Sequence, residues 1–297
     1  MDRAGLLSKI APFPLLANRL SADLLAGNYR SVFRGQGIEF DEVRRYEAED
    51  DARSIDWNVS ARFGVPYVKL YREEREMTVC IILDSSASMF TPGASGPGEN
   101  YTLYEQGLLA AALIAYSAER SGQRLSALFF DSEIRRIFPP RKGKSHVMAF
   151  VTAALDNRPK KKGTGLGAAL TGANSMLKRR SLVIVISDFL SLNWEQEMGE
   201  ISRKHDAIAI RIAGPLENEI PCKGFFNLED PETGLNVRSP VYSGFGSAWK
   251  TWHLERRQLW EAIIRRSGAA WLSLSTEDDA ASVLAGFFRR KWDRSHK

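Results

Sequence analysis

The sequence is poor in the residues that build disulfide frameworks and zinc sites. Only two cysteines and four histidines occur in 297 residues. A disulfide scaffold needs several cysteines at close spacing, but Cys80 and Cys222 stand far apart in the chain. Structural zinc needs closely spaced cysteine or histidine pairs, and the histidines are scattered. We therefore expect a reduced protein with neither a disulfide framework nor structural zinc.

Long apolar runs are also lacking. No segment approaches the ~20 apolar residues that a membrane-spanning helix needs. The N-terminal segment mixes charges with apolar residues and is interrupted by Pro12 and Pro14, unlike a secretion signal. The composition is otherwise that of a globular protein, 44% hydrophobic and 26% charged. These features predict a cytoplasmic protein without a transmembrane segment.

A long run of basic residues is absent as well. The chain has 41 Lys and Arg against 36 Asp and Glu, and its net charge of +5 comes from local clusters. It shows no zinc-finger spacing, no aromatic RNA-binding signature and no basic-zipper heptads. Nucleic-acid binding is therefore the least favoured alternative, and we expect no nucleic-acid partner.

The most informative stretch is Thr78–Met89, TVCIILDSSASM. Its apolar run has the length of a strand that is buried on both faces, and it ends in an acid and serines. Ligands of open α/β sheets bind at the carboxyl ends of parallel strands. Asp84, Ser86 and Ser88 alternate along the loop, so their oxygens can converge on a hard cation. From this motif alone, serines that only cap a helix or form a turn remain an open alternative.

Two further loops extend this pattern. Ser181 to Asp188, SLVIVISD, repeats the order of apolar strand, serine and acid. Thr164 stands in a Gly-Thr-Gly turn before a helical pattern. Because these loops are expected at the same rim of the sheet, we predict one site with five oxygen-bearing residues: Asp84, Ser86, Ser88, Thr164 and Asp188.

Strand and helix patterns alternate from residue 78 to the C-terminus, which predicts an α/β fold with a mostly parallel central sheet and helices on both faces. The predicted domain spans residues 77–297, with a hairpin insertion near 225–240 that turns at Asp-Pro-Glu-Thr-Gly. Residues 1–76 are predicted to hold an amphipathic helix over 15–25 and a charged arm from residue 35. The aromatic content of this arm predicts that it is folded, with its acids and arginines paired internally.

The set Asp-x-Ser-x-Ser, Thr, Asp resembles the metal-ion-dependent adhesion site (MIDAS) of von Willebrand factor A domains. More specifically, the segments RRYEAEDDARSIDWNVSAR and VKLYREERE, followed by DSSASM, FFDSEI and VISDF, are similar to the bacterial family called domain of unknown function 58. This resemblance runs from about Gly35 to the C-terminus. It implies a von Willebrand factor A-like, Rossmann-like fold and no enzymatic activity.

The resemblance also implies a role as a protein-interaction adaptor. Such an adaptor would work beside a MoxR-type AAA+ ATPase in chaperone-like maturation or assembly of other proteins. The five site residues would hold Mg²⁺ or Mn²⁺, since both accept oxygen ligands. An acidic side chain of a partner or client would complete the metal shell, flanked by the loop from Thr91 to Asn100 and by Lys160 to Lys162.

A metal-dependent phosphotransfer or hydrolase enzyme is the main alternative. In phosphotransferases with an aspartate nucleophile, a second acid stands two residues further on, but here that residue is Ser86. A serine hydrolase would need a nucleophile elbow, which the sequence does not supply. Gly163-Thr-Gly-Leu-Gly167 lacks the lysine of a phosphate-binding loop.

Overall fold

The computed structural model describes residues 3–13, 39–47, 50, 55–72, 77–91, 102–159, 163–217, 225–229, 231–232, 234–240 and 244–295. The chain divides into two compact units, of which one joins Met1–Tyr29 to Met77–Lys297 and the other is Arg30–Glu76. Residues 1–29, which the sequence analysis grouped with the arm, thus belong to the larger unit. The helix predicted over 15–25 lies outside the described residues.

The larger unit is built on a six-stranded sheet with the order β10-β7-β6-β3-β4-β5. All neighbouring strands are parallel except β4 and β5, which pair antiparallel as a hairpin. The prediction of a mostly parallel α/β sheet is therefore confirmed. The strands are β3 (Thr78–Asp84), β4 (Arg124–Phe130), β5 (Ile134–Arg141), β6 (Leu182–Ser187), β7 (Asp206–Ala213) and β10 (Ala270–Ser275).

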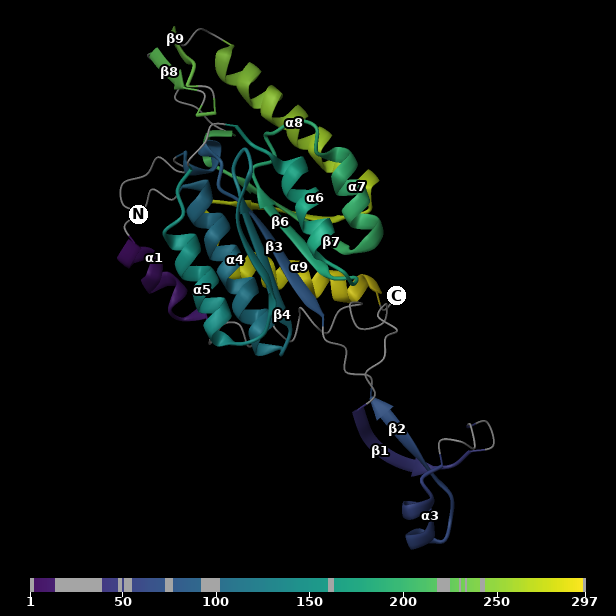
Figure 1. The fold of residues 1–297 in the computed structure, drawn as a ribbon. Coiled ribbons are helices and arrows are strands. Elements are labelled where there is room, and N and C mark those ends of the chain that lie inside the picture. Colours follow the sequence, from purple (N-terminus) through teal and green to yellow (C-terminus); the bar gives the residue numbers. More distant parts are fainter. Residues whose placement is uncertain are drawn as a thin grey trace. The chain divides into compact units, whose positions relative to one another are not determined.

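Helices cover both faces of this sheet. α4 and α5 lie on one side, and α6, α7 and α8 lie on the other (Figure 1). α9 packs against α4 and β10. The bounds of these helices are α4 (Leu103–Arg120), α5 (Lys144–Leu155), α6 (Leu166–Met176), α7 (Glu195–Lys204), α8 (Phe245–Ser267) and α9 (Ala280–Ser295).

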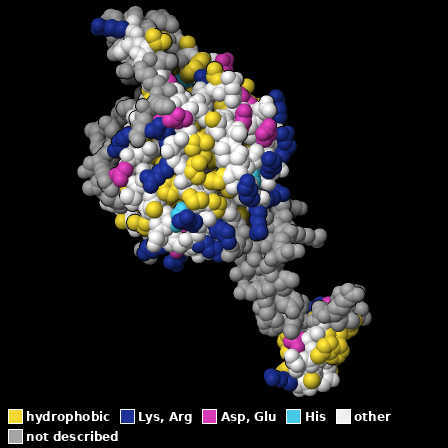
Figure 2. Space-filling view, in the orientation of Figure 1, with side chains coloured by type: hydrophobic (Ala, Val, Ile, Leu, Met, Phe, Trp, Pro, Cys, Tyr) yellow, Lys and Arg dark blue, Asp and Glu magenta, His cyan; other side chains and the backbone are white. Residues whose placement is uncertain are grey.

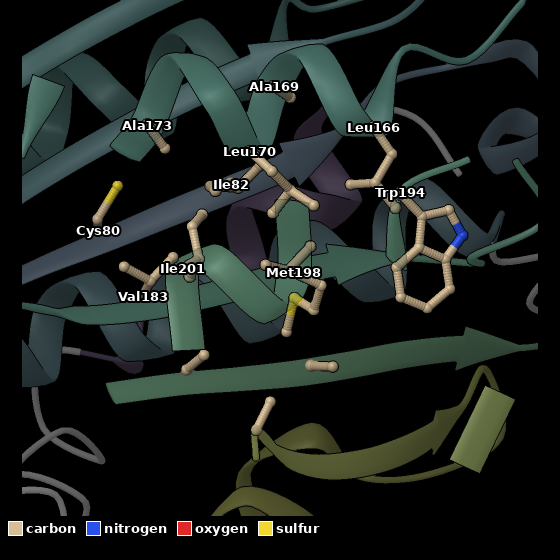
Figure 3. Packing of buried hydrophobic residues seen from close by; sticks show 14 of the residues in the cluster. Cys80, Ile82, Leu166, Ala169, Leu170, Ala173, Val183, Trp194, Met198 and Ile201 are labelled. Atoms are coloured by element: carbon tan, nitrogen blue, oxygen red, sulfur yellow. The ribbon is translucent and has the colours of Figure 1, made fainter. Parts of the chain in front are cut away.

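The apolar run of β3 is buried on both faces because successive side chains of a strand point to opposite sides. Cys80 and Ile82 pack with Leu170 of α6 and Met198 of α7 in one cluster (Figure 3). Ile81 points to the opposite face, which α4 covers, and is also fully buried. The buried length of β3 therefore carries apolar side chains on both faces, and its polar site residue lies at its carboxyl end.

The N-terminal helix α1 (Arg3–Ile10) was not predicted, because Pro12 and Pro14 obscure the helical pattern of this segment. The helix ends before Pro12, as expected for a residue that cannot continue a helix. It contacts α4 and buries Leu6 and Ile10.

The smaller unit, Arg30–Glu76, has its own sheet and helix. β1 (Glu39–Arg45) pairs antiparallel with β2 (Tyr67–Arg72), and α3 (Trp57–Phe63) starts at Asp56, whose carboxylate accepts hydrogen bonds from two backbone N–H groups. The internal ion pairing that we predicted is present between Arg44 and Asp50. The pKa of the Asp50 carboxyl is lowered, first by a hydrogen bond from the backbone of Glu47 and then by Arg44.

The predicted hairpin near 225–240 consists of β8 (Phe225–Glu229) and β9 (Asn236–Pro240). These strands form a separate two-stranded sheet instead of extending an edge of the main sheet. In the part of the chain that the structure describes, no helix is long and apolar enough to span a membrane.

Gly165 precedes α6 at a close approach between two loops. A Cβ at this position would lie 2.5 Å from the carbonyl oxygen of Ser132. We expect Gly165→Ala to lower the free energy of unfolding by about 1–3 kcal/mol, because backbone atoms must shift. Gly199→Ala in α7 is the control, since a Cβ there meets nothing within 4 Å and should stabilise the helix by about 0.5–1 kcal/mol. Urea unfolding of both variants measures the difference; equal stabilities would contradict the expectation.

Candidate functional site

The site lies where two neighbouring parallel strands end. Asp84 is the last residue of β3, and Asp188 directly follows β6. The register, in which Leu83 pairs with Ile186, places the two strand ends side by side. The exposed fractions of Asp84 and Asp188 are 0% and 2%, so two carboxyl groups are buried next to each other.

Both oxygens of the Asp84 carboxylate accept hydrogen bonds. The Ser187 hydroxyl donates to Oδ2 at 2.6 Å, and the Ser86 backbone N–H donates to Oδ1 at 2.9 Å. Burial, and then the charge of Asp188, raises the pKa of Asp84 to about 7, while the hydrogen bonds from Ser187 and Ser86 oppose this rise. The carboxylate is therefore held in one orientation at an electrostatic cost.

The loop after β3 brings two hydroxyl groups together. The Oγ atoms of Ser86 and Ser88 are 3.1 Å apart, and both residues are buried. Ser86 precedes the short 3-10 helix η2 (Ala87–Phe90) but makes no capping hydrogen bond with its side chain. Helix capping, the alternative explanation for these serines, therefore does not account for Ser86. The Ser85 hydroxyl instead donates to the carbonyl of Phe130.

Asp188 has one satisfied and one unsatisfied oxygen. Its Oδ1 accepts a hydrogen bond from the Leu190 backbone at 3.0 Å. Its Oδ2 is buried and has no hydrogen-bond partner among the described residues. The pKa of Asp188 is raised, mainly by burial and also by the charge of Glu232, while the Ser88 hydroxyl, the Leu190 amide and Arg211 lower it.

Thr164 lies on the loop before α6 and is half-buried. The neighbouring Gly165 N–H donates to the carbonyl of Asp131, at the end of β4. On its other side, the Gly163 N–H donates to Oε2 of Glu232 at 2.7 Å, while Oε1 of Glu232 accepts from the Ser88 N–H at 3.0 Å. The contacts among the described residues thus join Asp84, Ser86, Ser88 and Asp188 directly, and they bring the Thr164 loop to this group through Glu232.

Ser187 and Glu232 are site residues that the sequence analysis missed. Ser187 is the last residue of β6, and its side chain is expected to point opposite to that of Asp188. Its hydroxyl donates a hydrogen bond to Asp84. Glu232 lies in the turn of the β8–β9 hairpin, where the sequence signals only a turn. Of the two segments predicted to flank the site, residues 92–100 of the loop from Thr91 to Asn100 and all of Lys160 to Lys162 lie outside the described residues.

The donor set suits a small oxygen-binding cation rather than zinc. No cluster of three or more His, Cys, Asp or Glu side chains fit for a metal is found in the described part of the chain, and the oxygens that gather here come from two carboxylates and from hydroxyl groups. Neighbouring oxygens in an octahedral Mg²⁺ shell are about 3 Å apart, close to the 3.1 Å between the Ser86 and Ser88 hydroxyls. Oδ2 of Asp188, which has no hydrogen-bond partner among the described residues, is a further oxygen that could bind an ion.

Comparison with known proteins gives a family model, described as "Protein of unknown function DUF58", that matches residues 42–243. The uncharacterized protein Rv1480 of Mycobacterium tuberculosis is 27% identical over 290 residues, which cover 97% of this chain and 90% of the relative.

Solved structures also match. The conserved hypothetical protein BatB from Bacteroides thetaiotaomicron has a TM-score of 0.47 and 15% identity, over 72% of this chain and 98% of that one. The VWA domain of SpRpn10 has a TM-score of 0.43 and 10% identity, over 72% of this chain and 95% of that one.

Ser187 provides a test of the buried network. Its hydroxyl donates to Asp84 and accepts from the Phe189 N–H at 2.9 Å. In EDTA, we expect Ser187→Ala to lower the free energy of unfolding by about 1–3 kcal/mol, because both buried partners lose a hydrogen bond. Ser175→Ala, at an exposed serine of α6, should change it by no more than about 0.5 kcal/mol. Equal effects in urea titrations would show that the Ser187 bonds contribute nothing.

Proposed function

The chain belongs to the DUF58 family of proteins of unknown function, and we propose that it is a non-enzymatic, metal-dependent adaptor that binds other proteins. The observation that carries this proposal is the convergence of Asp84, Ser86, Ser88 and Asp188 at two adjacent strand ends. Buried like charges are costly unless they are compensated. A divalent cation supplies that compensation.

Asp84, Ser86, Ser88, Thr164 and Asp188 would hold Mg²⁺ or Mn²⁺, directly or through water. A bound ion would supply a positive centre that can take an additional oxygen ligand. Three of the five residues are neutral hydroxyl ligands, so only Asp84 and Asp188 would bring negative charge to the ion. An acidic side chain of a partner is the ligand that this centre favours. Binding of the partner then depends on the metal and selects for an acid.

The resemblance to the domain of unknown function 58 family, seen in the arm and in DSSASM, supports a MoxR-type AAA+ ATPase as the partner. In this proposal the ATPase supplies mechanical work, and the adaptor connects it to client proteins that are matured or assembled. The acidic ligand comes from the ATPase or from the client.

The geometry favours an adaptor over a phosphotransfer enzyme. A nucleophilic carboxylate must reach its substrate, but Asp84 is fully buried and both of its oxygens accept hydrogen bonds. The residue two positions further on is Ser86, which cannot act as a second carboxyl acid or base. Lys and Arg side chains on the visible face of the protein are interspersed with apolar and uncharged areas (Figure 2), which gives no support to nucleic-acid binding.

Calorimetric titration with Mg²⁺ and Mn²⁺ tests the metal site. We expect the wild-type protein to bind either ion, and Asp84→Asn to lose at least about tenfold in affinity, because one anionic ligand is removed. Asp131→Asn is the matched control. Asp131 is also a buried acid at a strand end, but its carboxylate contacts Arg135 and the Glu133 N–H, so metal affinity should be retained. Ser86→Ala replaces Asp84→Asn if the latter fails to fold.

The same samples separate the adaptor from the enzyme. Binding to the MoxR-type ATPase of the same organism should require Mg²⁺, vanish in EDTA and be lost in Asp84→Asn. Metal-dependent hydrolysis of a phosphatase substrate by the wild type, absent in Asp84→Asn, would overturn the non-enzymatic proposal. Equal metal affinity in the wild type and both Asp84→Asn and Ser86→Ala would overturn the proposed site.

A further inference from the structure

The rim of the site already holds an acidic side chain. Glu232, in the turn between β8 and β9, places Oε1 3.0 Å from the Ser88 N–H and Oε2 2.7 Å from the Gly163 N–H. The two donors belong to two different loops of the site. Each carboxylate oxygen thus accepts a hydrogen bond from one of these amides, and Glu232 joins the turn of the hairpin to the loops that carry Ser88 and Thr164.

This pair of N–H groups is built to receive a carboxylate. Hydrogen bonds from backbone N–H groups to a charged acceptor are among the strong ones, and backbone donors do not have to be ordered again for each ligand. Ser88 is held in η2, and its hydroxyl lies 3.1 Å from the hydroxyl of Ser86, which precedes η2. Gly163 has a φ of +94°, a conformation that glycine adopts without strain. Any acid that reaches the rim meets the same two donors.

The topology of the hairpin indicates that this contact can be exchanged. The hairpin forms a separate two-stranded sheet, and an isolated two-stranded hairpin is only marginally stable. Moving the hairpin leaves the pairing of the six-stranded sheet intact, because neither β8 nor β9 is a strand of that sheet.

We propose that the Ser88 and Gly163 amides form the binding position for the acidic side chain of a partner, and that Glu232 occupies this position as an internal substitute. A partner then binds by displacing the β8–β9 hairpin. This inference rests on the proposed adaptor function and adds its regulation: the resting site is closed by the chain's own acid.

The first experiment tests whether Glu232 is docked, and it needs no metal. Amide NMR spectra of the full-length protein in EDTA are compared for the wild type, Glu232→Ala and Glu255→Gln, which removes an exposed acid from α8. The Ser88 and Gly163 amide signals should move upfield and exchange faster with solvent in Glu232→Ala only, because their charged acceptor is lost. If neither amide signal changes, the inference is overturned.

The second experiment tests whether the position accepts an external acid. N-acetylglutamate amide is titrated into each protein in the presence of Mg²⁺, with N-acetylglutamine amide as the neutral control. The acidic probe should shift the Ser88 and Gly163 signals of Glu232→Ala at an about tenfold lower concentration than those of the wild type, because it no longer competes with a tethered carboxylate. The neutral probe should shift neither.

The two proposals fail in different ways. Equal responses of the wild type and Glu232→Ala to the acidic probe, or no response in either, would overturn the internal substitute while leaving Mg²⁺ binding to be judged by calorimetry. A selective response of Glu232→Ala in a protein whose calorimetry shows no Mg²⁺ binding would retain the substitute and overturn the metal-dependent function.

Discussion

Two carboxyl groups buried side by side are the constraint around which this site is arranged. Asp84 and Asp188 end adjacent parallel strands and are removed from water, so their charges repel each other in a medium that screens poorly. The Ser187 hydroxyl and the amides of Ser86 and Leu190 each offset part of the cost. One oxygen, Oδ2 of Asp188, remains without a partner among the described residues. Buried charges of this kind are weak evidence of stability, and they are the basis of the metal site that we propose.

The sheet explains why the polar groups meet where they do. Apolar side chains fill both faces of β3 and β6, so polar residues are excluded from the strands and collect at the carboxyl ends, where helix coverage stops. A third loop joins them through the backbone, because the Gly165 N–H is bonded to the carbonyl of Asp131 at the end of β4. Gly165 is required for this approach, since a side chain would meet the Ser132 carbonyl.

Much of this arrangement could be predicted from the sequence, because its signals are local. The apolar runs before Asp84 and Asp188 fix strands whose ends share one rim, and the alternation of strand and helix fixes the sheet. The hydrogen bond between Glu232 and the Ser88 N–H could not be predicted, because the two residues are 144 positions apart in the chain. The sequence of the hairpin turn also does not indicate which loop the turn will contact. Helix α1 was missed because nearby prolines hide its short pattern.

The tether between Glu232 and the site has a consequence for which partners succeed. A group that belongs to the same chain as its binding position can act at an effective concentration on the order of millimolar. A single free carboxylate below that concentration cannot compete, however often it collides with the rim. Only a partner that adds further contacts to its acid, or that grips the hairpin itself, overcomes this threshold. In the docking that we propose, the hydrogen bonds from Ser88 and Gly163 to Glu232 thereby act as a filter against the abundant acidic metabolites and protein surfaces of a cell.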